Sequence, residues 1–184
     1  MKEFINLLRQ NNALILDTET TGLDNRAEIV QIGIASLDGK ELFNSFVQPA
    51  KTRRWPDAQR VHGISWSAVQ NAPTMGQLSE ELKEIMNGRL VAIYNADFDT
   101  RILRQSIKAD SAANLYQWLQ KLEWECVMQA YAEYWGQRNT RYGSYKWQSL
   151  TNACRQQGVK VSNAHDALGD ALLTAALLRS IEQT

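Results

Sequence analysis

The chain has 184 residues, enough for one domain with a well-filled core and too few for two comfortable ones. Its 20 basic and 20 acidic side chains give a formal net charge of zero, which excludes the basic excess typical of proteins that coat nucleic acid non-specifically. No uncharged run approaches the roughly 18 apolar residues of a membrane helix. Cys126 and Cys154 have neither CxxC nor disulfide-scaffold spacing, so we expect a reducing compartment and a cytoplasmic protein.

The first part of the chain is predicted to form three strands. The apolar run 13–17 is typical of a buried strand. The runs 28–37 and 41–49 flank Asp38-Gly39, a strong hairpin signal, so this second pair of strands is expected to be antiparallel.

The middle of the chain alternates helices with strands. Residues 74–88 carry apolar side chains at helical spacing and end in a glycine, and the run 89–95 then returns to a buried strand. Helices are predicted over 98–107 and 111–122, and a fifth strand over 123–127.

The remainder is predicted to be helical and to end in a helix within 165–183 that is apolar on most sides. Three strands followed by this alternation indicate one mixed sheet with helices on both faces, an α/β fold. With no repeat, low-complexity stretch or linker, residues 1–184 are expected to form a single domain.

Two carboxylates, Asp17 and Glu19, end the first strand. Residues i and i+2 of a strand point to the same side, so these side chains project together. Two like charges so close raise each other's pKa unless a positive group lies between them. They are either helix caps or exposed turn acids, or ligands of a hard divalent cation, which prefers oxygen ligands.

Two further acidic segments follow. Asp97 and Asp99 lie where the strand 89–95 gives way to a helix, although acids are common at helix N-termini for dipole reasons alone. Asp166 and Asp170 are four residues apart and share a helix face, with His165 at the start of that helix. None of these segments is decisive by itself.

Together and in this order, the segments resemble the DEDDh 3′→5′ exonucleases, typified by the proofreading subunit of bacterial replicative DNA polymerase. The motifs are LDTETTGL (16–23), NADFD (95–99) and HDALGD (165–170). VHGI (61–64) is similar to a family segment that lines the terminal-nucleotide pocket, and 147–159 is similar to the helix before the third motif. The resemblance covers nearly the whole chain. It implies a ribonuclease H-like fold, with a five-stranded mixed β-sheet flanked by α-helices.

The resemblance also implies the roles of the acids. The implied metal ligands are Asp17, Glu19, Asp99 and Asp170, with His165 as general base. Asp97 and Asp166 then occupy variable positions of the motifs. Four such carboxylates carry about −4, which two Mg²⁺ ions would offset. The all-oxygen ligand set favours Mg²⁺, with Mn²⁺ as a substitute, over zinc.

A nucleotide pocket is implied beside the acids. Its residues would be Thr20, Leu23, Val61, His62, Ile64, Asn95 and Phe98. Leu23 would wedge against the terminal base, His62 would lie near the 3′-hydroxyl, and Phe98 would stack on a base. For Phe98 and Ile64, plain core packing is the alternative.

One long segment, from Tyr134 to His165, contains no Asp or Glu. Aromatic residues interleave with its cations Arg138, Arg141 and Lys146, a pattern that suits a track for a single-stranded backbone. The alternative is a solvated loop packed by its own aromatics. Residues 51–55, KTRRW, are a weaker second candidate for substrate binding.

The sequence thus predicts a metal-dependent 3′→5′ exodeoxyribonuclease that hydrolyses 3′ ends, preferably of single-stranded DNA, and releases 5′-mononucleotides. An exoribonuclease acting on RNA 3′ ends and a non-catalytic domain that binds nucleic acid or a polymerase are the alternatives. All five catalytic positions are filled, which argues against the binding domain. Because the chain ends soon after the third motif, a free-standing nuclease is expected, with polymerase association or a homodimer left open.

Overall fold

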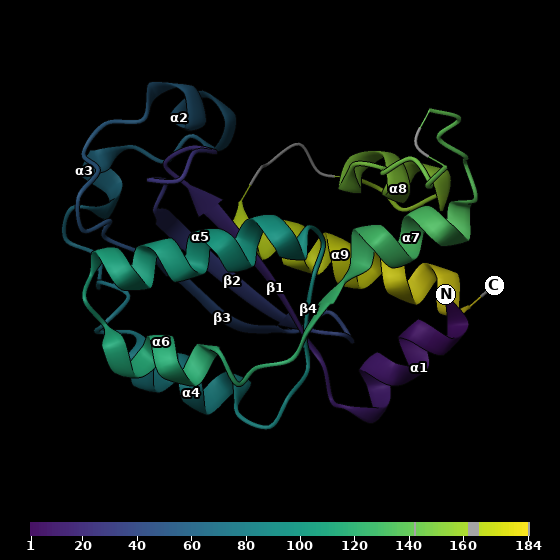
Figure 1. The fold of residues 1–184 in the computed structure, drawn as a ribbon, viewed down its shortest axis with the longest axis horizontal. Helices are drawn as coiled ribbons and strands as arrows, with labels where there is room; N and C mark the ends of the chain where they lie inside the picture. The colour runs from purple at the N-terminus through teal and green to yellow at the C-terminus, as the bar shows by residue number, and fades with distance from the viewer. Residues whose placement is uncertain (142, 162–165, 184) are drawn as a thin grey trace.

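The centre of the molecule is a five-stranded mixed sheet with the order β3-β2-β1-β4-β5 (Figure 1). The computed structural model describes residues 1–141, 143–161 and 166–183. The strands are β1 (Leu14–Thr20), β2 (Ile29–Ser36), β3 (Glu41–Phe46), β4 (Val91–Ile93) and β5 (Trp124–Cys126). The pairs β1–β2 and β2–β3 are antiparallel, whereas β1–β4 and β4–β5 are parallel. The predicted mixed sheet and its hairpin are therefore confirmed.

Helices cover both faces of this sheet. They are α1 (Lys2–Gln10), α2 (Pro56–His62), α3 (Trp66–Val69), α4 (Ser79–Met86), α5 (Ala96–Ala109), α6 (Ala113–Leu119), α7 (Val127–Trp135), α8 (Leu150–Gln156) and α9 (Ala167–Glu182). The side chains of α4, α5 and α6 form one apolar core, and those of α1, α7, α8 and α9 form another. Among the described residues, no helix is both long and apolar enough to cross a membrane.

Strand β1 contributes to both cores in alternation. Leu14 and Leu16 pack into the core under α5, whereas Ile15 packs into the core under α9. Because strand side chains alternate between faces, Asp17 and Glu19 continue the α9 side and Thr18 continues the α5 side. This alternation decides which helix each polar residue of β1 meets.

Gly33 of β2 lets α9 come close to the sheet. It lies directly opposite Asp17 in the antiparallel ladder. A Cβ atom on Gly33 would lie 2.3 Å from the backbone nitrogen of Leu168, a distance that side chains do not tolerate. The first turn of α9 therefore rests on bare backbone, which places the residues that follow Leu168 beside the end of β1.

Two expectations for the helices need correction. The short helices α2 and α3 were not predicted, because each is brief and lacks a sustained apolar period. The expectation that everything after 127 is helical is wrong for residues 137–141, 143–149 and 157–161. There α7 ends at Gly136 in the left-handed conformation, and an isolated bridge pairs Arg138 with Tyr145.

Candidate active site

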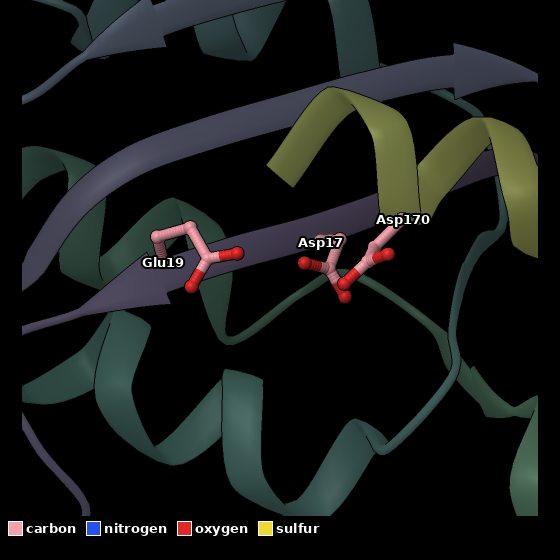
Figure 2. A group of neighbouring side chains, drawn as sticks. All are labelled: Asp17, Glu19 and Asp170. Carbon is pink, nitrogen blue, oxygen red and sulfur yellow. The ribbon is translucent and has the colours of Figure 1, made fainter. Parts of the chain in front are cut away.

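Three carboxylates meet at the end of β1. Asp17 and Glu19 come from the strand and Asp170 comes from the first turn of α9. One oxygen atom from each lies within 4.8 Å of the others. Figure 2 shows the three carboxyl groups gathered between the strand and the helix. The predicted same-side projection of Asp17 and Glu19 thus holds, and Gly33 provides the room that brings Asp170 to them.

The electrostatics of this cluster are unfavourable without a counter-ion. Burial, followed by the charges of Asp99, Asp170 and Glu19, raises the pKa of Asp17 well above its ordinary value. Burial and the charges of Asp170, Asp166 and Asp99 raise the pKa of Glu19 to about 8. Every one of these contributions disfavours the ionised form. A hard divalent cation bound by the carboxylate oxygens would reverse that balance, so the donor set fits a divalent metal.

Asp99 lies outside this group of three but close to it. It is 4% exposed in the first turn of α5, and its Oδ1 accepts a hydrogen bond of 2.7 Å from the hydroxyl of Thr18. Burial raises the pKa of Asp99 to about 7, and the bond from Thr18 opposes that shift. Asp99 in turn contributes to the raised pKa of both β1 acids.

Thr18, which contacts a predicted ligand, is a residue of the site that the sequence did not single out. Its position between two acids of a strand places it on the opposite face of the sheet, where α5 lies. That alternation was the available signal. Its partner Asp99 became evident only from the packing of α5.

The remaining predicted acid and base positions behave differently. His165 lies outside the described residues. Asp97 is exposed on α5. Asp166 caps α9, because its side chain accepts a hydrogen bond of 3.2 Å from the backbone N–H of Gly169. A helix cap accounts for Asp166 without a ligand role.

His62 joins the end of α2 to the end of β1. Its Nδ1 accepts a hydrogen bond of 3.0 Å from the backbone N–H of Ile64. Its Nε2 lies 3.1 Å from the carbonyl oxygen of Thr20 and, with Nδ1 accepting, is the atom that donates. Both ring nitrogens therefore contact main chain here, and contact of His62 with a 3′-hydroxyl stays a prediction.

The other predicted pocket residues fall into exposed and buried groups. Leu23 is 79% exposed and Val61 61%, so both present apolar surface to solvent. The Thr20 hydroxyl donates to the carbonyl of Gly22. Ile64 is buried in a small core with Val30, Trp55 and Val69, and this packing anchors the VHGI segment to the rest of the fold.

Two predicted pocket residues lie at the start of α5. Asn95 is its N-cap, and its carbonyl accepts from the backbone N–H of Phe98 and of Asp99. Phe98 is half-buried against the core, with the guanidinium of Arg101 5.4 Å from its ring centroid. Substrate contact by either residue stays a prediction.

The described residues of the acid-free segment that lie between α7 and α8 are mostly exposed. The guanidinium of Arg138 lies 4.6 Å from the ring centroid of Tyr145, and Trp147 is 67% exposed. Arg141 and Lys146 are also exposed. Midway along the segment, the carbonyl of Gln148 accepts a hydrogen bond of 2.8 Å from the hydroxyl of Tyr94, which lies just before α5.

A family model described as exonuclease matches residues 14–178. That range includes both β1 acids, α5 and the first turns of α9. The chain belongs to this exonuclease family.

Relatives within the family cover most of the chain. The uncharacterized exonuclease CP81 of Escherichia phage 186 is 33% identical over 174 residues, which span 94% of this chain and 89% of that protein. The DNA polymerase III subunit epsilon of Haemophilus influenzae is 26% identical over 95% of this chain and 67% of its own length. The resemblance inferred from the three motifs is thereby confirmed.

Solved structures agree with the fold. Exonuclease X, in complex with 5′-overhanging duplex DNA, superposes with a TM-score of 0.66 at 25% identity, over 94% of this chain and 92% of that one. A structure of exonuclease I superposes with a TM-score of 0.71 at 17% identity, over 93% of this chain and 40% of that one. The ribonuclease H-like fold predicted for this exonuclease-family chain is confirmed.

Proposed function

We propose that this chain is a metal-dependent 3′→5′ exodeoxyribonuclease that removes nucleotides from DNA 3′ ends as 5′-mononucleotides, with single strands preferred. The observation that carries the proposal is the cluster of Asp17, Glu19 and Asp170, whose carboxyl oxygens gather within 4.8 Å in an exonuclease-family fold. The relative named as a DNA polymerase III subunit and the neighbour solved with duplex DNA support DNA as the substrate class.

The acids would hold the metal. Asp17, Glu19 and Asp170 offer a compact set of oxygens, and Asp99, steadied by Thr18, is the fourth proposed ligand. Two Mg²⁺ ions, or Mn²⁺ in their place, would when bound activate a water and stabilise the leaving 3′-oxygen. Four ionised carboxylates would supply a charge that matches two divalent cations.

The remaining residues would bind substrate and move a proton. His165 would act as the general base, because a neutral imidazole can accept the proton of the attacking water. Leu23 and Val61 present exposed apolar surface that a terminal base can contact. Arg138, Arg141 and Lys146 would hold phosphates of the nucleotides upstream of the scissile bond.

The test is mononucleotide release from oligonucleotides labelled at either the 5′ or the 3′ end. We expect Mg²⁺-dependent shortening from the 3′ end and none in EDTA. The Asp17→Asn variant should be inactive, which excludes a contaminating nuclease. An RNA oligonucleotide of the same sequence distinguishes the two nucleic acids: faster cleavage of RNA would replace the proposal with an exoribonuclease, and no release from either would refute it.

A further inference from the structure

A cleft of about 600 Å³ opens beside the loop that follows β1. Residues 21–28, residues 51–54 and the last turns of α5 contribute its walls. Thr21 and Gly22 lie on its edge and follow Glu19 closely in the chain, so the cleft adjoins the candidate active site. The proposed function assigns no role to it.

A buried acid holds two walls of the cleft together. Glu28 is 2% exposed, and its carboxylate accepts hydrogen bonds from the backbone N–H groups of Ala50, Lys51 and Thr52 at 2.7 to 3.1 Å. The Thr52 hydroxyl donates a further bond of 2.7 Å. These hydrogen bonds, most of them from main-chain N–H groups, compensate the buried carboxylate of Glu28. They also fix residues 50–52 beside the start of β2.

Helix α5 forms the third wall of the cleft, and its side chains hold the loop that follows β1. Gln105 of α5 donates to the carbonyls of Asp24 and Ala27 at 3.2 and 2.9 Å. Arg101, one turn earlier, donates to the carbonyl of Leu23 at 3.1 Å. Because side chains of α5 and Glu28 secure the loops, the cleft is preformed rather than a gap between mobile segments.

Four cations surround this cleft. They are Arg26, Lys51, Arg54 and Lys108, all exposed, and we call the space between them the cationic cleft. Within the described part of the chain, none of the four forms an ion pair with a carboxylate. The exposed acid on the lining is Asp24. A chain with no net charge therefore carries a local positive excess beside its acidic site.

The structure divides the KTRRW segment between two roles. Arg53 donates to the carbonyl of Pro49 at 2.6 Å, and Trp55 is buried and donates to the carbonyl of Ile64 at 2.8 Å. Arg53 and Trp55 therefore stabilise the fold. Lys51 and Arg54 instead line the cleft. Among the described residues, the side chain of neither one donates a hydrogen bond to a carbonyl group.

Helix α5 connects the candidate active site, at its first turn, with the cationic cleft, at its last turn. Asp99 lies in its first turn and Lys108 in its last, about 13 Å further along the axis. The acid-free segment is bonded before the start of α5 through Tyr94 and Gln148. In Figure 1, α8, which belongs to that segment, and α7 lie beyond one end of α5, and α3 lies towards its other end. Asp99 therefore lies at the end of α5 nearer the acid-free segment, and Lys108 lies at the end that lines the cationic cleft.

We propose that the cationic cleft binds backbone phosphates of the strand that is paired with the one being shortened. A 3′→5′ exonuclease holds the last nucleotide of the cleaved strand at its acids, so nothing of that strand continues past them. Only the complementary strand, as a single-stranded 5′ overhang, extends beyond a recessed 3′ end. Arginine and lysine side chains hold such a backbone through its phosphates, without reading bases. The inference rests on the proposed function and assigns the second strand of one further substrate to this cleft: beside the preferred single strands, duplexes with recessed 3′ ends would also bind.

The test compares binding of three ligands in EDTA, where no cleavage occurs. They are a duplex with a 5′ overhang, a blunt duplex of the same paired length, and a single strand. The variant carries Arg26→Gln, Lys51→Gln and Arg54→Gln. The matched control carries Lys2→Gln, Lys40→Gln and Lys121→Gln, three exposed cations towards the opposite end of β1.

We expect the cleft variant to lose about tenfold in affinity for the overhang duplex relative to the blunt duplex. Its salt dependence on the overhang duplex should fall by about 2 in slope, since each lost single-strand phosphate contact removes about 0.7. The control variant should keep the overhang preference of the parent. An unchanged ratio, an equal loss on all three ligands, or the same loss in the control would overturn the proposal.

Failure of the cleft and failure of the nuclease are separable. A parent protein that releases no mononucleotide with Mg²⁺ refutes the proposed function, whereas the overhang preference is measured without metal. A parent that cleaves 3′ ends but shows no preference for the overhang refutes the cleft alone. Thermal melting of the cleft variant, expected to match the parent, confirms that Gln at these exposed positions leaves the fold intact.

Discussion

The hydroxyl of Thr18 donates a 2.7 Å hydrogen bond to Oδ1 of Asp99, and both residues are buried. The bond crosses from the central strand to α5 on the face of the sheet opposite Asp17 and Glu19. It fixes the orientation of a carboxylate whose pKa is raised by burial and lowered by this bond, with a net value of about 7.

Replacement of Thr18 by valine, which has the same shape, should therefore weaken metal binding. Residues that orient a metal ligand typically account for 10–100-fold in affinity, so we expect Mg²⁺ affinity to fall by about tenfold. Isothermal titration of the metal-free protein measures this. Thr18→Ser keeps the hydroxyl and should bind Mg²⁺ like the parent; equal affinity in the valine and parent proteins would contradict a positioning role.

The Asp17→Asn variant should lose turnover while gaining stability without metal. Replacing one crowded carboxylate by a neutral amide relieves repulsion but removes a ligand. For a domain of this size, about 1 kcal/mol corresponds to roughly 2–4 °C, so we expect a melting temperature in EDTA at least about 3 °C higher. A lower melting temperature, or near-normal activity with Mg²⁺, would contradict the assignment. The exposed Asp97→Asn is the matched control and should change neither.

Stability of the metal-free protein should fall as pH rises from about 4 to about 8. The pKa of Glu19 is raised to about 8 and that of Asp99 to about 7. The folded state therefore binds protons more tightly than the unfolded state over this range, so the free energy of unfolding decreases with pH. Because Mg²⁺ binds the ionised carboxylates, its stabilising effect should grow with pH. Melting curves at several pH values, in EDTA and in Mg²⁺, measure both trends; a stability that rises with pH in EDTA would contradict them.

His165→Ala should lower turnover by at least about 10²-fold, the usual contribution of a positioned general base. Metal affinity should survive, since no ligand role is proposed for His165. The pH–rate profile of the parent should show an acidic limb that His165→Asn removes. An unchanged limb in that variant would assign the base elsewhere.

Substitutions in the acid-free segment should weaken substrate binding and leave the chemical step unchanged. Replacing Arg138, Arg141 and Lys146 together by Gln should raise KM on long single strands with little change in kcat, the signature of lost uniform binding. The salt dependence should flatten by about 0.7 in slope for each lost contact. Dinucleotides, which cannot reach the segment, should be cleaved as by the parent. Superimposable KM values at every oligonucleotide length would identify an ordinary solvated loop.

The sequence alone determined the features that depend on neighbours along the chain. Asp17 and Glu19 point to one side because strand side chains alternate, and the Asp38-Gly39 turn joins two antiparallel strands because such turns match the strand twist. The three motifs in their order were sufficient for the family, which the match over residues 14–178 confirms.

Tertiary structure decided what meets across the fold. Asp170 reaches the β1 acids because Gly33, opposite Asp17, leaves no side chain in the path of α9. Thr18 donates a hydrogen bond to Asp99 because α5 packs on the other face of the sheet. The KTRRW cations divide between fold and cleft because buried Glu28 fixes the backbone of residues 50–52, a bond between distant segments that no local pattern encodes. Contacts of this kind depend on register and packing between elements, so only the folded chain reveals them.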